Sequence, residues 1–138
     1  MLARTLLAIT LGALSTSCAG LDRANECHSI GRLTNPVLAD IDHDRMVLKP
    51  ASYRTIATKY EALANATGQV QIRSRHLAEA VNDYQRMLHE AARDARSFAD
   101  ALDANDEGRL LLARTTATRT MRHEATALSK IDNACRGR

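Results

Sequence analysis

The chain has 138 residues, a formal net charge of +3 at neutral pH, 3% aromatic residues and no tryptophan. This length suits one domain, and the small net charge argues against the dense basic surface on which nucleic-acid binding depends. Few aromatic residues and only 6 glycines disfavour a sheet and favour helices. We therefore predict an all-α fold and no nucleic-acid partner.

The first residues have the pattern of an export signal. Arg4 is the only charge in this segment, and an apolar run of about nine residues extends from Leu6 to Leu14. A helix that spans a bilayer needs about 20 apolar residues, whereas the apolar part of a secretory signal is about 7–15 residues long. We therefore predict that residues 1–17 are a signal peptide and that residues 18–138 form one mature domain.

The end of this segment is similar to a known processing site. The residues Ser15-Thr16-Ser17-Cys18 resemble the lipobox of bacterial lipoproteins, although Ser15 departs from the leucine that the family usually has three positions before its cysteine. The resemblance covers only residues 1–18. It implies that Cys18 receives a diacylglyceryl group and becomes the mature N-terminus.

Two alternatives to lipid attachment stay open. Cleavage after Ala19, at a small-x-small site, would yield a soluble periplasmic or secreted protein, and an uncleaved chain is the third reading. The residue after Cys18 is Ala19 and not an aspartate. If the lipobox is used, the resemblance implies that a lipoprotein with this residue is sorted to the outer membrane. The expected location is the periplasmic side of that membrane.

The chain has three cysteines, an odd number that is unusual in an exported protein. Acylation or removal of Cys18 leaves Cys27 and Cys135, and disulfides persist in the oxidising compartments outside the cytoplasm. We therefore predict a Cys27–Cys135 disulfide. The alternative is that both are free thiols.

The mature part predicts four helices, of which the first two are marked by prolines. The first covers about 21–47, with a kink or break at Pro36, because the residue before a proline avoids the helical conformation. The second covers 50–67: Pro50 suits a first turn, and Gly68 is a natural stop. The apolar stripe of the first helix is Cys27, Ile30, Thr34, Val37, Leu38 and Ile41, and that of the second is Tyr53, Ile56, Ala57, Tyr60, Leu63 and Ala64.

The third and fourth helices are predicted over about 70–104 and 107–134, with Asp106 as the cap of the fourth. The third has an unbroken heptad seam, the pattern of helices that pack along their length. This seam consists of Leu77, Val81, Tyr84, Leu88, Ala91, Ala95, Phe98 and Leu102. The stripe expected for the fourth helix is Leu110, Ala117, Met121, Ala125, Leu128, Ile131 and Cys135.

Four amphipathic helices with short connections predict an antiparallel up-down-up-down four-helix bundle. In such a bundle the start of the first helix and the end of the fourth lie at the same end. Cys27 and Cys135 occupy these two points, so the predicted topology and the predicted disulfide agree.

Two polar clusters suggest chemistry. Asp40, His43 and Asp44 carry metal-ligand side chains on neighbouring helix positions, but no matching ligands face them, so the sequence favours a solvated polar face and no metal. The segment from Arg109 to His123 contains four arginines and no acid. It would face either an anionic partner or, as we prefer, the acidic residues Glu90, Asp94, Asp100 and Asp103 of the third helix.

No nucleophile–base motif or phosphate-binding loop is visible, and no cofactor is expected. The sequence therefore predicts a non-enzymatic lipoprotein of the bacterial cell envelope, attached to the membrane through its lipid anchor, that acts as an interaction or structural module with a protein partner. A periplasmic ligand- or metal-binding bundle is the alternative. A small secreted enzyme is the third reading.

Overall fold

The computed structural model describes residues 15–137, with side chains from residue 20 onward. The predicted signal segment lies almost entirely outside these residues. The described chain forms four helices and no strand: α1 (Ser15–Arg45), α2 (Pro50–Gly68), α3 (Arg75–Asp103) and α4 (Glu107–Cys135). The all-α prediction is therefore confirmed.

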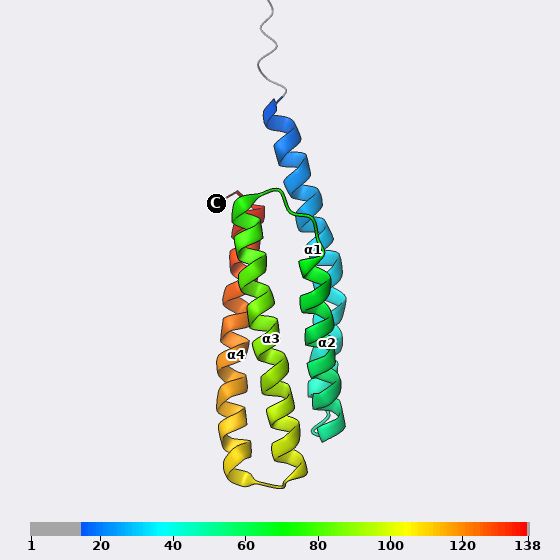
Figure 1. Cartoon of the computed structure of the whole chain (residues 1–138), viewed down its shortest axis with the longest axis vertical. Coiled ribbons are helices and arrows are strands. Elements are labelled where there is room, and N and C mark those ends of the chain that lie inside the picture. Colours follow the sequence, from blue (N-terminus) through cyan, green and yellow to red (C-terminus); the bar gives the residue numbers. More distant parts are fainter. Residues whose placement is uncertain (1–14, 138) are drawn as a thin grey trace, which may run out of the picture.

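The helices lie with their long axes roughly aligned, and the connections alternate between two ends of the molecule (Figure 1). The α1–α2 and α3–α4 connections lie at one end, and the α2–α3 connection lies at the other, together with the C-terminus (Figure 1). α2 packs against α1 and α3, and α3 packs against α2 and α4, whereas α1 and α4 touch at few positions. We call this sparse contact the α1–α4 seam.

α1 differs from its predicted form, because it is one continuous helix that includes Pro36 and begins at Ser15. Of the predicted kink or break at Pro36, the break does not occur. Proline has no N–H to donate, so the carbonyl group four residues earlier loses its helical hydrogen bond, and Pro36 lies on the exposed face, where water is accessible. Ile30 and Ile41 are buried on either side of Pro36 along the helix. Packing on both sides of the proline therefore maintains the helix.

α3 begins at Arg75 and not at residue 70, because Ser74 supplies the cap: its hydroxyl accepts a hydrogen bond from the Leu77 N–H at 3.5 Å. Val70 and Ile72 belong to the α2–α3 connection and are half-buried against the core. Because Val70 and Ile72 are apolar, the predicted helix extended over them. The predicted cap of α4 is confirmed, since Asp106 Oδ1 accepts from the Arg109 N–H at 3.0 Å.

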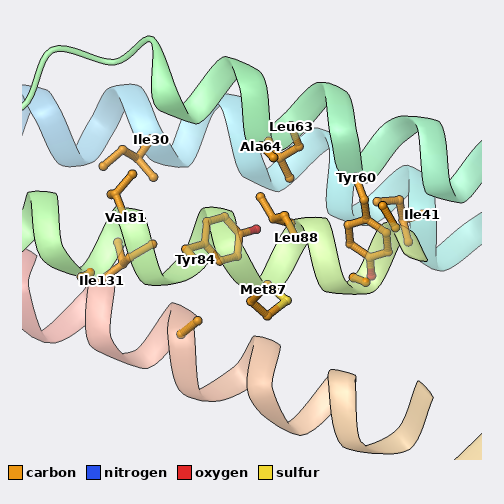
Figure 2. Close-up of a cluster of buried hydrophobic side chains, with 14 of the residues drawn as sticks. Ile30, Ile41, Tyr60, Leu63, Ala64, Val81, Tyr84, Met87, Leu88 and Ile131 are labelled. Atoms are coloured by element: carbon orange, nitrogen blue, oxygen red, sulfur yellow. The ribbon is translucent and has the colours of Figure 1, made fainter. Parts of the chain in front are cut away.

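The predicted seam of α3 forms the centre of the core. All its members are buried except Leu102, which is half-buried. Figure 2 shows Ile30, Val81 and Ile131 at one end of the cluster and Tyr60 and Ile41 at the other, so all four helices contribute to it. The tyrosine and aliphatic positions that the sequence assigned to α2 are buried there as well, apart from the half-buried Tyr53.

α4 is rotated relative to its predicted orientation. Its buried residues are Ala113, Thr120, Ala127, Ile131 and Ala134. Of the expected stripe only Ile131 is buried, and Met121 and Ala125 are exposed. α4 therefore packs on α3 mainly through small side chains, and Ala117 and Met121 of its predicted apolar stripe lie on the side of α4 near Arg45 of α1.

A disulfide joins Cys27 of α1 to Cys135 at the end of α4, as the sequence predicts, with Cα atoms 5.9 Å apart. It connects residues 108 positions apart. It also bridges the α1–α4 seam at the end of the molecule that holds the C-terminus (Figure 1).

Candidate binding site

A cavity of about 420 Å³ opens beside the last turn of α1, between α2, α3 and α4. It lies far from the disulfide: the α1 residues from Cys27 to Arg45 span about 27 Å at 1.5 Å per residue. Its lining consists of Arg45, Leu48, Tyr53, Ile56, Tyr60, Ala91, Asp94, Ala95, Phe98, Arg114, Ala117, Thr118, Thr120 and Met121. We call it the seam cavity.

The wall of the seam cavity is mainly apolar and aromatic. The rings of Tyr53 and Phe98 meet with centroids 4.4 Å apart. Four members of the core cluster line the seam cavity, namely Ile56, Tyr60, Ala91 and Ala95, together with the buried Phe98. At the surface Leu48 is 57% exposed and Met121 45% exposed. These two side chains extend the apolar lining to the solvent.

A polar cluster closes one side of the seam cavity. The Arg45 guanidinium donates to Asp42 Oδ1 at 2.8 Å and to the hydroxyl of Tyr60, and it lies 3.6 Å from Glu124 Oε2. Burial raises the pKa of the Glu124 carboxyl above its ordinary value, and the attraction of Arg45 opposes this shift. Burial also raises the pKa of the Tyr60 hydroxyl. Among the described residues, Arg45–Glu124 is the only ion pair between α1 and α4.

The basic segment of α4 does not find the acidic partners that the sequence suggested. Asp100 and Asp103 instead bind Arg54 of α2, and Asp94 accepts a hydrogen bond from the hydroxyl of Thr120. Within residues 20–137, the side chains of three arginines of this segment, Arg114, Arg119 and Arg122, form no ion pair. The preferred prediction for this segment is therefore wrong.

The metal candidates have a different role in the structure. Asp40 and Asp44 lie on one face of α1, and both carboxylates bind Lys59 Nζ of α2, at 3.0 and 2.8 Å. His43 is exposed. Across the described part of the chain, no three metal-ligand side chains form a group that would hold an ion. These carboxylates therefore join α1 to α2.

The backbone of Cys18 lies at the end of the first turn of α1, but its side chain is outside the described residues, so lipid attachment stays a prediction. Within the described helices, none has the length and apolar character required to cross a membrane. Comparison of the chain with protein-family models, with curated proteins and with solved structures finds no match.

Sequence reasoning did not identify the seam cavity as a site. It placed Tyr60, Phe98 and Ala117 in the core, gave Arg45 no particular role, and considered Arg114 only as one residue of the basic segment of α4. The available signal was the width of the apolar stripe on α4, which includes Met121 as well as the alanines that pack on α3. An apolar stripe that is wider than the surface through which the helix packs on its neighbour indicates that part of the stripe is left uncovered.

Proposed function

We propose that this chain is a non-enzymatic lipoprotein of the bacterial cell envelope that binds an apolar group in the seam cavity. In this proposal the fold is an antiparallel up-down-up-down four-helix bundle, anchored to the membrane through Cys18. The observation that carries the proposal is the cavity itself: about 420 Å³, mainly apolar, and continuous with exposed apolar side chains. Pockets of this size and lining are typical of sites for small apolar ligands.

The position of the seam cavity supports this role. Cys18 precedes the disulfide in α1, whereas the cavity lies beyond the other end of that helix, beside Arg45. An anchor at Cys18 would therefore hold the disulfide end near the membrane and direct the cavity into the periplasm. The disulfide would keep α1 and α4 together near the membrane, while their sparse contact elsewhere leaves the cavity accessible.

Binding can be tested with the full-length chain in lipid nanodiscs, labelled with ¹³C at its methionine methyl groups. Dodecanol, a neutral amphiphile, is expected to shift the Met121 resonance in a saturable manner and to leave the buried Met87, which does not line the cavity, unchanged. Ala117→Phe, which fills the cavity, is expected to weaken this binding roughly tenfold or more, equivalent to about 1.4 kcal/mol.

Ala125→Phe is the matched control, because Ala125 is exposed on the same helix and does not line the seam cavity. It is expected to bind dodecanol like the unchanged protein. A Met121 resonance that does not respond to dodecanol, or one that responds equally in both phenylalanine variants, would refute binding in this cavity.

The lipid anchor has a separate test. Cells that express the full chain are expected to incorporate labelled palmitate into it, and Cys18→Ala is expected to abolish the label and release the protein from the outer-membrane fraction. Unchanged membrane attachment of Cys18→Ala would contradict the anchor. Release of the unmodified chain into the periplasm or the medium would instead favour cleavage after Ala19.

A further inference from the structure

We propose that the ligand of the seam cavity is a fatty acid, whose carboxylate binds Arg114 and whose hydrocarbon chain lies along the aromatic wall. This inference rests on the proposed binding function and adds the chemical class of the ligand. It joins two independent features of the cavity, its apolar lining and an unpaired guanidinium at its opening.

One cation of the cavity lining has no partner within the described part of the chain. Two arginines and one aspartate line the cavity. Arg45 is engaged by Asp42, Tyr60 and Glu124, and the Asp94 carboxylate accepts the hydroxyl of Thr120. The Arg114 guanidinium, in contrast, makes no hydrogen bond or ion pair with any residue in the described part of the chain.

Arg114 therefore places an unpaired guanidinium at the opening that an anionic ligand can bind, while Asp94 of the lining keeps its own negative charge, because a hydroxyl donor does not neutralise a carboxylate. A guanidinium presents parallel N–H groups that match the two oxygens of a carboxylate. Arg119 and Arg122, on the same helix, are also without ion pairs among the described residues and add to the positive potential around the opening. A cationic amphiphile would be repelled by Arg114, and a neutral one would leave Arg114 unpaired.

The arrangement of the wall specifies where the hydrocarbon chain lies. Arg114 is exposed at the opening, where Leu48 and Met121 are also partly exposed. Farther inside, the wall consists of the Tyr53–Phe98 ring pair and small aliphatic side chains. A ligand with a charged head at the surface and an unbranched apolar body inside matches this order of polar and apolar groups.

The test compares three twelve-carbon amphiphiles that differ only in their heads: dodecanoate, dodecanol and dodecylamine. Each is titrated below its micellar concentration into the full-length chain in nanodiscs, with the Met121 methyl resonance as the reporter. Dodecanoate is expected to bind most tightly and dodecylamine most weakly. Arg114→Ala is expected to weaken dodecanoate binding about three- to tenfold, the range of a partly exposed ion pair with good geometry, and to weaken dodecanol binding much less.

Arg119→Ala is the matched control, because Arg119 is exposed on α4 but does not line the cavity. It is expected to reduce dodecanoate binding much less than Arg114→Ala does. If dodecanol binds as tightly as dodecanoate, or if the two alanine variants lose the same affinity, the fatty-acid proposal is overturned while apolar binding stands. If none of the three amphiphiles shifts Met121, the proposed function fails as well.

Discussion

Replacing Cys135 with serine is expected to lower the free energy of unfolding by about 3–5 kcal/mol, the largest effect of any single change considered for this chain. The disulfide joins residues 108 positions apart. In the chain-entropy model, a cross-link over a loop of about 100 residues removes unfolded-state freedom worth about 4.7 kcal/mol. Because the free energy of unfolding of a domain is commonly only about 5–15 kcal/mol, the disulfide supplies a large part of the stability of the fold.

The measurement is urea unfolding of the full chain, followed by circular dichroism. Cys27→Ser is expected to lose the same stability as Cys135→Ser, and the double variant is expected to lose no more than either, because each change removes the same bond. A reducing agent should destabilise the unchanged protein and leave the variants unaffected. A loss below about 1 kcal/mol would show that the disulfide constrains the unfolded chain far less than the model requires.

Leu88→Ala is expected to destabilise the fold by about 2–5 kcal/mol, the range measured when a buried leucine is truncated. Leu88 is fully buried, with 0% of its surface exposed, and belongs to the core cluster that receives side chains from all four helices. Truncation removes apolar contacts and leaves a void, because the surrounding helices cannot collapse completely around it.

Leu111→Ala is the matched control for this prediction. Leu111 lies on α4 with 69% of its surface exposed, so its truncation is expected to change stability by no more than about 0.5 kcal/mol. Urea unfolding of the full chain measures both variants. Equal losses for the two substitutions would mean that the stability of the fold does not depend on the α3 seam.

The α3 seam was predictable because its signal is local and uninterrupted. Positions from Leu77 to Phe98 repeat at intervals of three and four residues, and every one of them is buried. The cysteine pairing was predictable because few combinations existed. If Cys18 is acylated or removed, as the sequence predicts, Cys27 and Cys135 remain, and the helix pattern places them at one end.

The sequence did not reveal interactions in which a residue's environment depends on another helix. Pro36 is tolerated within α1 because packing on both sides of it maintains the helix. Asp40 and Asp44 bind Lys59, which is brought to them by the packing of α2. The arginines of α4 lack the acids of α3 because two of those acids, Asp100 and Asp103, bind Arg54 instead. None of these partners can be identified from positions along one helix.

The seam cavity also depends on contacts between helices and not on the pattern within one helix. The sequence by itself determined that four helices form, which face of α3 is apolar and which cysteines are available to pair, because these properties follow from residue type and from spacing within one segment. Only the tertiary structure decided how α4 is rotated on α3 and how little of it α1 covers. Rotation depends on the simultaneous fit of side chains from several helices, and the cavity exists because that fit leaves part of an apolar stripe uncovered.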